Sequence, residues 1–214
     1  MHIDRLVLGA YENNCYIIRD SKKAADCIII DTGLSSTLLI DFLRKNNLNP
    51  QTLILTHGHG DHIAGITSLR NNFGQIKVCI HKADSHMLSN ARDNLSVLVG
   101  AKITAIPADI LLDKEEQIEY ADISLQIIHT PGHSPGGICL YNKDEKILFS
   151  GDTLFAGSVG RTDFPGYDTE KCMAQLISNI KNKLLVLPED TKVLPGHGES
   201  TTIRQEKLYN PYLH

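Results

Sequence analysis

The sequence predicts an α/β fold in which mixed β-sheets are covered by helices. Short β-branched runs alternate with segments of helical periodicity in both halves of the 214-residue chain, and each half also holds hairpin-like strand pairs. Such alternation is typical of layered α/β folds rather than of a helical bundle or an all-β barrel. No low-complexity segment or long linker divides the chain. The length suits one domain with a sizeable core.

The first half of the chain begins with strands. β-branched runs between polar turns predict strands at residues 5–9, 15–19, 27–31, 52–56 and 76–80. The segment 34–47 carries an apolar stripe at helical spacing, formed by Leu34, Leu38, Leu39, Phe42 and Leu43. A second helix is expected to begin near Asp61, because apolar residues follow it at the same spacing. Residues 82–99 are expected to be mostly helical.

The second half repeats this organisation. Strands are expected around Leu111 and Ile118, at residues 123–129, and as a pair about a polar turn within 138–152. A glycine-rich loop is expected at 157–166. The helix predicted at 168–182 places apolar side chains on one face, namely Cys172, Met173, Leu176, Ile177 and Ile180. The segment 191–198 is expected to close the core.

Composition argues against several classes of function. The formal net charge is −4, and no Lys/Arg cluster is interleaved with aromatic residues, so neither nucleic-acid binding nor a nuclease is expected. The N-terminus lacks the pattern of an export signal, and no apolar run is long enough to span a membrane. The five cysteines are scattered and never in C-x-x-C spacing, which predicts reduced thiols in a cytoplasmic protein.

The stretch "THGHGDHIAG", residues 56–65, is unusually dense in side chains that bind metals. It holds three histidines and one aspartate within six positions: His57, His59, Asp61 and His62. Three later stretches add one candidate ligand each: "HTPGHSPGG" adds His133, "FSGDTLF" adds Asp152, and "LPGHGES" adds His197. Each stretch follows a predicted strand and contains glycine or proline, and loops of this kind are where functional residues collect.

The chemistry of this set favours a reactive metal site. Imidazole and carboxylate without thiolate suit zinc or iron in catalysis rather than a structural zinc. Seven ligands exceed the needs of one tetrahedral ion and suit two ions, which in catalytic pairs lie ~3.5–4 Å apart. A carboxylate can bridge that distance and a single imidazole cannot. Two divalent ions, two carboxylates and one hydroxide sum to about +1, which favours an anionic substrate.

The pattern His57-x-His59-x-Asp61-His62, followed by His133, Asp152 and His197, resembles the metallo-β-lactamase superfamily. The resemblance extends over nearly the whole chain and implies a four-layer αβ/βα sandwich with two mixed β-sheets, as a single domain over residues 1–214. Two stretches are similar to glyoxalase II-like hydrolases in their short bacterial form, which lacks the C-terminal glutathione-binding helical domain. They are "SGDTLFAGSVGRTDFPG" and "PGHGESTTIRQEKLYNPYL".

The resemblance also implies a role for each residue of the site. One metal is assigned to His57, His59 and His133. The other is assigned to Asp61, His62 and His197, and Asp152 bridges the two. The cofactors implied are two divalent ions, with zinc expected first and iron or manganese also suited to nitrogen and oxygen ligands. Asp61 and Asp152 are the candidate catalytic residues.

Two further residues have roles that the sequence leaves open. Asp31 matches an aspartate that supports the metal ligands from behind, although it could instead cap the following helix or turn. Arg161 matches a basic residue that meets the peptide part of glutathione, although it could instead be a loop arginine paired with Asp163.

The function implied is hydrolysis of a thioester, S-acylglutathione or a similar small anionic acyl-thiol, by a metal-bound hydroxide. Zinc lowers the pKa of bound water to about 7. The leaving thiolate has a conjugate acid with a pKa of ~8.5, so it departs without a strong general acid. No serine or cysteine nucleophile is required.

Three alternatives remain open. A persulfide dioxygenase would hold one iron at the positions of His57, His133 and Asp152, although the "GRTDFPG" loop favours the hydrolase. Lactone or lactam hydrolysis could use the same dinuclear site. A metal-dependent binding module without catalytic activity is the third. Oligomeric state is not predicted.

Overall fold

The computed structural model describes residues 1–74 and 76–214. They form two compact units: residues 1–113 with 119–124, and residues 114–118 with 125–214. Two six-stranded sheets account for most of the strands. The division between the units falls within β7 (Gln117–Tyr120) and β8 (Ile123–His129). The expectation of a single domain over 1–214 stays a prediction.

The first sheet is mixed. Its spatial order is that of the chain: β1 (His2–Leu8), β2 (Asn13–Arg19), β3 (Asp26–Ile30), β4 (Asn49–Ile54), β5 (Lys77–His81) and β6 (Ile110–Leu112). The first three strands pair antiparallel, whereas β3 to β6 pair parallel. The parallel part places the ends of β3, β4 and β5 at one edge. Loops that follow these strands are therefore neighbours.

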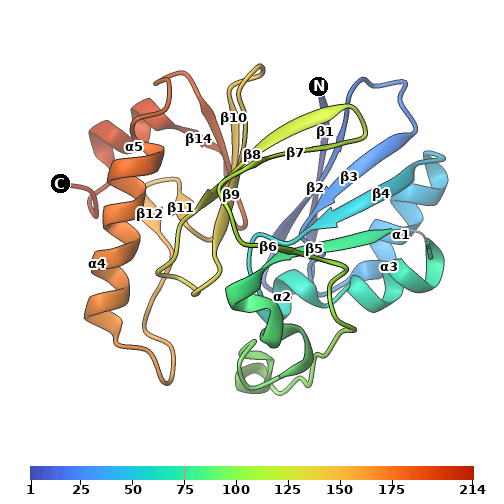
Figure 1. The fold of residues 1–214 in the computed structure, drawn as a ribbon, viewed down its shortest axis with the longest axis horizontal. Coiled ribbons are helices and arrows are strands. Elements are labelled where there is room, and N and C mark those ends of the chain that lie inside the picture. The colour runs from blue at the N-terminus through green and yellow to red at the C-terminus, as the bar shows by residue number, and fades with distance from the viewer. Residues whose placement is uncertain (75) are drawn as a thin grey trace. The chain divides into compact units, whose positions relative to one another are not determined.

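Helices cover the first sheet by their apolar stripes (Figure 1). The helices are α1 (Ser36–Lys45), α2 (Gly60–Ile63) and α3 (Ile66–Asn72). Five of their side chains are fully buried in one core cluster with the strands, namely Leu39, Leu43, Ile63, Ile66 and Leu69. Of the stripe predicted at 34–47, Leu39, Leu43 and Phe42 pack in this cluster, whereas Leu38 is 58% exposed.

The helix expected from Asp61 onward is interrupted after Ile63. Both the backbone N–H and the hydroxyl of Thr32 donate to the carbonyl of His62, at 3.0 and 2.9 Å. This carbonyl is therefore bonded by the loop after β3 instead of by the next helical turn. Gly65 packs against the same threonine, where a Cβ would lie 2.7 Å from that of Thr32. At this break, the contacts of Thr32 therefore connect the segment of candidate ligands to the loop after β3.

Residues 82–99, expected to be mostly helical, are divided into two separate helices. They form two 3-10 helices, η1 (Lys82–Ser89) and η2 (Ser96–Val99), separated by turns. The buried side chain of Asn94 donates to the carbonyls of Met87 and Ile103 and accepts from the N–H of Ser96. An asparagine that bonds the backbone in this way competes with helical hydrogen bonds, which explains the break.

The second sheet is also mixed. Its order is β14 (Thr201–Thr202), β13 (Lys192–Pro195), β10 (Ile147–Gly151), β9 (Ile138–Asn142), β8 and β7. Strands β10 and β13 pair parallel, whereas β13–β14, β10–β9 and β9–β8 pair antiparallel. The α/β class with two mixed sheets is confirmed.

The second sheet is covered by α4 (Thr169–Asn179), which continues into a π-helical stretch η3 (Ile180–Leu184), and by α5 (Ile203–Tyr209) (Figure 1). Leu176, Ile180 and Leu184 are fully buried in a cluster with strand residues. The expected glycine-rich loop is in part ordered as strand, because β11 (Leu154–Phe155) and β12 (Ser158–Val159) form a short antiparallel hairpin.

The structure also bears on two expectations from composition. All five cysteines are free, four of them buried and Cys172 partly exposed. Across the described residues, the helices are too short or too polar to cross a bilayer.

Candidate metal centre

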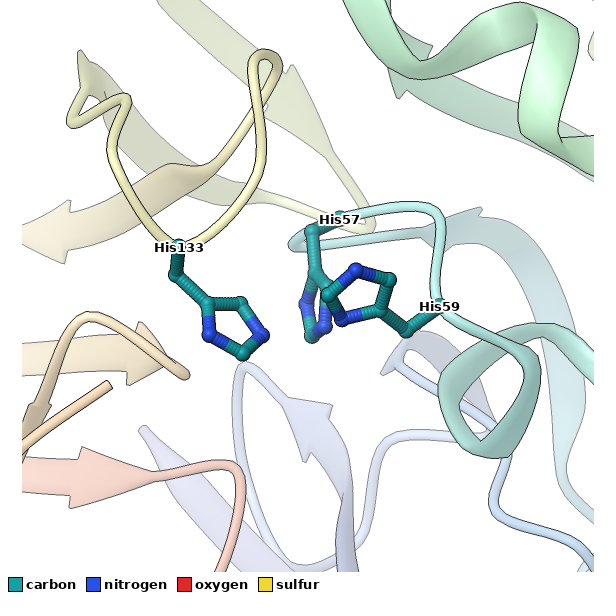
Figure 2. Close-up of side chains that lie close together, drawn as sticks. All are labelled: His57, His59 and His133. Atoms are coloured by element: carbon teal, nitrogen blue, oxygen red, sulfur yellow. The ribbon is translucent and has the colours of Figure 1, made fainter. Parts of the chain in front are cut away.

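The candidate ligands of the first unit lie on the loop between β4 and α2 and on α2 itself. The imidazole centroids of His57 and His59 are 4.6 Å apart in an edge-on arrangement, and those of His57 and His62 are 4.1 Å apart. Figure 2 shows His57 and His59 on the loop that follows β4, and His133 on the loop that connects β8 and β9. His57, His59 and His62 are each at least nine-tenths buried. This segment thus holds several imidazoles in a small, largely buried volume.

Asp61 and His62 lie at a separation typical of two ligands of one ion. The Oδ2 atom of Asp61 is 3.6 Å from Nε2 of His62. Two ligands bound at roughly 2.1 Å in tetrahedral geometry are about 3.4 Å apart, whereas a hydrogen bond between them is shorter. The side chain of Asp61 is 22% exposed and that of His62 is fully buried. Asp61 is therefore the carboxylate of this loop that solvent reaches.

Asp31 fixes the orientation of His62. Its Oδ2 atom lies 2.9 Å from Nδ1 of His62 and accepts from the hydroxyl of Thr56 at 2.7 Å, while Oδ1 accepts from the N–H of Thr56 at 2.9 Å. A carboxylate only accepts, so Nδ1 carries the proton and Nε2 keeps its lone pair. Helix α1 has Ser35 at its N-cap, so Asp31 does not cap it. The structure places Asp31 behind a candidate ligand.

Three residues that the sequence did not single out also contact this loop. The amide nitrogen of Asn13 lies 3.0 and 3.1 Å from the two ring nitrogens of His62, which places the amide over the face of the ring. The buried carboxylate of Asp84 accepts from the N–H of Gly58 at 3.0 Å, and the carbonyl of Asn94 accepts from the N–H of Gly60 at 2.8 Å. The candidate ligands were identified in the sequence as polar residues that come soon after a strand. Asp84 comes soon after β5, so the same pattern could have identified it.

The second unit gathers its three candidate ligands around one oxygen atom. Asp152 follows β10, and its Oδ2 atom lies 3.5 Å from Nε2 of His133 and 3.6 Å from Nε2 of His197. Both separations match two ligands of one ion rather than a hydrogen bond. One carboxylate oxygen thus faces two imidazole nitrogens. The described residues here fit a metal site in which Asp152 is shared.

The proton of His133 is also fixed by the protein. Its Nδ1 atom lies 2.9 Å from the backbone carbonyl of Arg161. A carbonyl accepts and cannot donate, so Nδ1 carries the proton and Nε2 keeps the lone pair that faces Asp152. The ring of Phe164 packs edge-on against the imidazole at 5.3 Å. This support by a backbone carbonyl is typical of histidines that bind metals.

Gly160 allows the backbone to approach two candidate ligands. A Cβ at this position would lie 1.9 Å from the carbonyl oxygen of Asp152 and 3.1 Å from Cβ of His133. No side chain fits there without moving the backbone. The sequence identified the surrounding motif, but not the reason for this glycine.

His197 occupies the loop after β13 and is the most accessible of the five histidines, with 26% of its side chain exposed. The N–H of the preceding Gly196 donates to the carbonyl of Gly151 at 2.8 Å, which ties this loop to the end of β10. Asp152 directly follows that end. The parallel pairing of β10 and β13 therefore brings the two ligand loops together.

Arg161 is paired with Asp163. Its Nε and Nη2 atoms donate to the two carboxylate oxygens at 2.7 and 3.1 Å, and its guanidinium lies 5.0 Å from the centre of the Phe164 ring. The hydrogen bond with Arg161 lowers the pKa of Asp163 below its usual value. More than half of each side chain is exposed. The structure thus shows Arg161 paired with Asp163, which was one of the two possibilities that the sequence left open. A substrate role for Arg161 stays a prediction.

Comparison with known proteins shows the family of this chain. A model of the metallo-beta-lactamase superfamily matches residues 8–197. The chain is 37% identical over 214 residues to the hydroxyacylglutathione hydrolase GloC of Haemophilus influenzae, with 100% of this chain and 98% of the relative covered.

Two solved structures are also similar. The B3 metallo-beta-lactamase BLEG-1 has a TM-score of 0.92 at 40% identity, with 99% of each chain covered. TTHA1623, solved in a di-iron-bound form, has a TM-score of 0.82 at 32% identity, with 98% of this chain and 100% of that chain covered. The chain belongs to the metallo-β-lactamase superfamily, and its family identifies it as a metal-dependent hydrolase.

Proposed function

We propose that this protein hydrolyses the thioester of a small anionic acyl-thiol, S-acylglutathione or a similar molecule. The observation that carries the proposal is the position of Asp152, whose single oxygen faces the Nε2 atoms of both His133 and His197. A carboxylate placed in this way is suited to bridge two ions. The relative GloC, named a hydroxyacylglutathione hydrolase, supports the thioester as the bond that is cleaved.

The proposed site has seven ligands for two divalent ions. His57, His59 and His133 hold one ion, Asp61, His62 and His197 hold the other, and Asp152 is shared. This assignment is supported by the ligand-like separations within each unit, Asp61–His62 in the first and Asp152–His133 and Asp152–His197 in the second. Zinc is proposed first. Iron and manganese suit the same ligands, and the di-iron form of TTHA1623 supports iron in a relative.

When bound, the ions would supply an activated water and polarise the carbonyl of the thioester. The chain's own contribution is to fix the ligands beforehand. Asp31 holds Nδ1–H of His62, and the Arg161 carbonyl holds Nδ1–H of His133. Asp61, whose side chain is 22% exposed, is proposed to orient the attacking water. Such prior orientation avoids reorganisation during the reaction.

The chain does not need a nucleophile of its own. Burial raises the pKa of Cys27 to about 12 and that of Cys139 to about 11, so both thiols stay protonated at neutral pH. The leaving thiolate, with a conjugate-acid pKa of ~8.5, departs without a general acid. The reaction proposed therefore depends on the metal ligands and not on a covalent intermediate.

Arg161 is proposed to contact the anionic part of the substrate. Its guanidinium stands beside Phe164, which packs on His133. Binding a substrate carboxylate would compete with Asp163 for the same donors. Replacement of Arg161 by alanine is therefore expected to raise KM more than it lowers kcat. We also propose a cytoplasmic location, which the free cysteines support.

A second candidate is hydrolysis of a lactam or lactone at the same site. It is favoured by the 40% identity to BLEG-1, which is described as a B3 metallo-beta-lactamase. Both reactions use water against an activated carbonyl, so the ligand set alone does not separate them.

The test compares substrates on the purified protein with its metal content measured. We expect about two ions per chain, as in other paired catalytic sites, and hydrolysis of S-lactoylglutathione that a chelator abolishes and Zn²⁺ restores. Asp152→Ala should lose both metal and activity. Asp144→Ala, in the exposed turn between β9 and β10, is the matched control. Faster turnover of nitrocefin would favour the lactamase, and one iron with O₂ uptake on a persulfide would favour a dioxygenase.

A further inference from the structure

A buried carboxylate in α5 is hydrogen-bonded to the β11–β12 hairpin. Glu206 of α5 is 3% exposed. Its Oε2 atom accepts from the N–H of Gly157 at 2.9 Å and from the amide of Asn210 at 2.7 Å, while Oε1 accepts from the hydroxyl of Thr201 at 2.6 Å. A carboxylate with three donors is well compensated for its burial.

Asn210 adds a second hydrogen bond to the hairpin. It is fully buried, and its amide donates to the carbonyl of Ser158 at 3.0 Å as well as to Glu206. The two side chains therefore hold consecutive residues at the turn of the hairpin. Gly157 sits there with φ +68°, a left-handed conformation that glycine adopts without strain.

The hairpin depends on such an anchor. Its two strands are joined by only two residue pairs, Leu154 with Val159 and Phe155 with Ser158. A two-stranded hairpin is marginally stable at best on its own, and one this short is weaker still. Burial of Leu154 and Val159 in the core cluster holds its strands, and the contacts from Glu206 and Asn210 hold the turn between them.

Both ends of the hairpin lead directly to candidate ligands. Before it, Asp152 and Thr153 leave β10. After it, the N–H of Gly160 returns to the carbonyl of Thr153 at 3.3 Å, and the carbonyl of Arg161 holds Nδ1 of His133 at 2.9 Å. The hairpin thus sets the path of the backbone that packs on Asp152 and orients His133.

We propose that Glu206 is a positioning residue for Asp152 and His133, acting through the β11–β12 hairpin. The proposal rests on the metal site proposed above. It also explains why the two stretches that resembled one class of hydrolase in the sequence, 150–166 and 195–213, belong together: their side chains and backbone are hydrogen-bonded to each other.

Three variants separate positioning from general stabilisation. Glu206→Ala removes the acceptor of Gly157 and Asn210. Glu206→Gln should rescue, because its amide oxygen can face both donors while its NH₂ group donates to the Thr201 hydroxyl, which can in turn donate to Gln205. Asn210→Ala removes the contact with Ser158. Lys207→Ala, on the exposed side of the same helix, is the control.

The readouts are the affinity for Zn²⁺, by competition with a chromophoric chelator, and the visible spectrum of the Co²⁺-loaded protein, both below the melting temperature. Mutation of groups that orient ligands typically weakens metal binding about 10–100-fold, and we expect roughly tenfold for Glu206→Ala with an altered Co²⁺ spectrum. Glu206→Gln and Lys207→Ala should match the wild type. Asn210→Ala should weaken Zn²⁺ binding in the same direction, and it decides the matter if Glu206→Ala does not fold.

Wild-type Zn²⁺ affinity and an unchanged Co²⁺ spectrum in a folded Glu206→Ala protein would overturn the inference, even if that protein melted earlier. The same result in Asn210→Ala would overturn it when Glu206→Ala cannot be purified. If the wild type binds no Zn²⁺, the proposed metal site itself is wrong, and the inference falls with it.

Discussion

The carboxylate of Asp31 lies 2.9 Å from Nδ1 of His62, and the same carboxylate accepts two hydrogen bonds from Thr56, one residue before the first loop histidine. Asp31 itself adopts φ +56°, in a region that few residues other than glycine, asparagine and aspartate occupy. A backbone strained in this way, directly after β3, is held by what its side chain binds. Asp31 thus joins the loops after β3 and β4.

Replacement of Asp31 by asparagine should weaken metal binding with little change in backbone conformation, because asparagine tolerates the same φ. Its amide can face only one side as an acceptor, so either Thr56 or His62 loses its partner. We expect affinity for Zn²⁺ to fall about 10–100-fold, measured by chelator competition. Asp20→Asn, at an exposed position, is the control. Unchanged affinity would show that Asp31 serves the fold alone.

Replacement of Gly160 by alanine should disturb Asp152 and His133 together. The new Cβ would meet the Asp152 carbonyl oxygen at 1.9 Å, so the backbone must move. Overpacking of this kind costs about 1–3 kcal/mol in the free energy of unfolding, which denaturant titration measures. Metal content should fall as well. Gly74→Ala is the matched control, since its Cβ would be 3.7 Å from the nearest heavy atom. A Gly160→Ala protein with full metal content would contradict the prediction.

Replacement of Asp84 by alanine should loosen the loop that carries His57 and His59. The N–H of Gly58 loses its buried acceptor, which costs about 1–3 kcal/mol in the free energy of unfolding. Asp84→Asn keeps an acceptor oxygen and should recover part of that loss. Hydrogen exchange at residues 56–62 is the measurement, with Asp93→Ala at a more exposed site for comparison. Equal exchange in Asp84→Ala and the wild type would refute the role.

The native protein should resist alkylation of its buried thiols. Burial raises the pKa of Cys79 and Cys139 to about 11, and that of Cys27 to about 12, so almost no thiolate exists at pH 8. Iodoacetamide should label Cys172, which is partly exposed, and leave the four buried cysteines until denaturant is added. Mass spectrometry of native and unfolded samples reads this directly. Rapid native labelling at Cys139 would be inconsistent with its burial.

Periodicity in the sequence predicted most elements of the fold, because the spacing of apolar residues follows from which face is buried. It predicted α1 and α4 by stripes that include fully buried residues, Leu39 and Leu176 among them. It did not predict the interruptions of helices, which occur where side chains replace the regular backbone bonds. Thr32 ends the helix after Ile63, and Asn94 divides residues 82–99 into two 3-10 helices. Neither contact leaves a trace in the local pattern.

By itself, the sequence determined the chemistry of the site: which residues can offer nitrogen or oxygen to an ion, and that they follow strands. Ligand type and strand periodicity are local properties, so they can be read from neighbouring residues. Only the tertiary structure decided the partners. It paired Asp31 with His62, Asp84 with Gly58 and Glu206 with Gly157, because these contacts join segments that are 26 to 49 residues apart. In the sequence, a carboxylate that is buried cannot be distinguished from one on the surface. The difference depends on hydrogen-bond donors that only the fold brings to it.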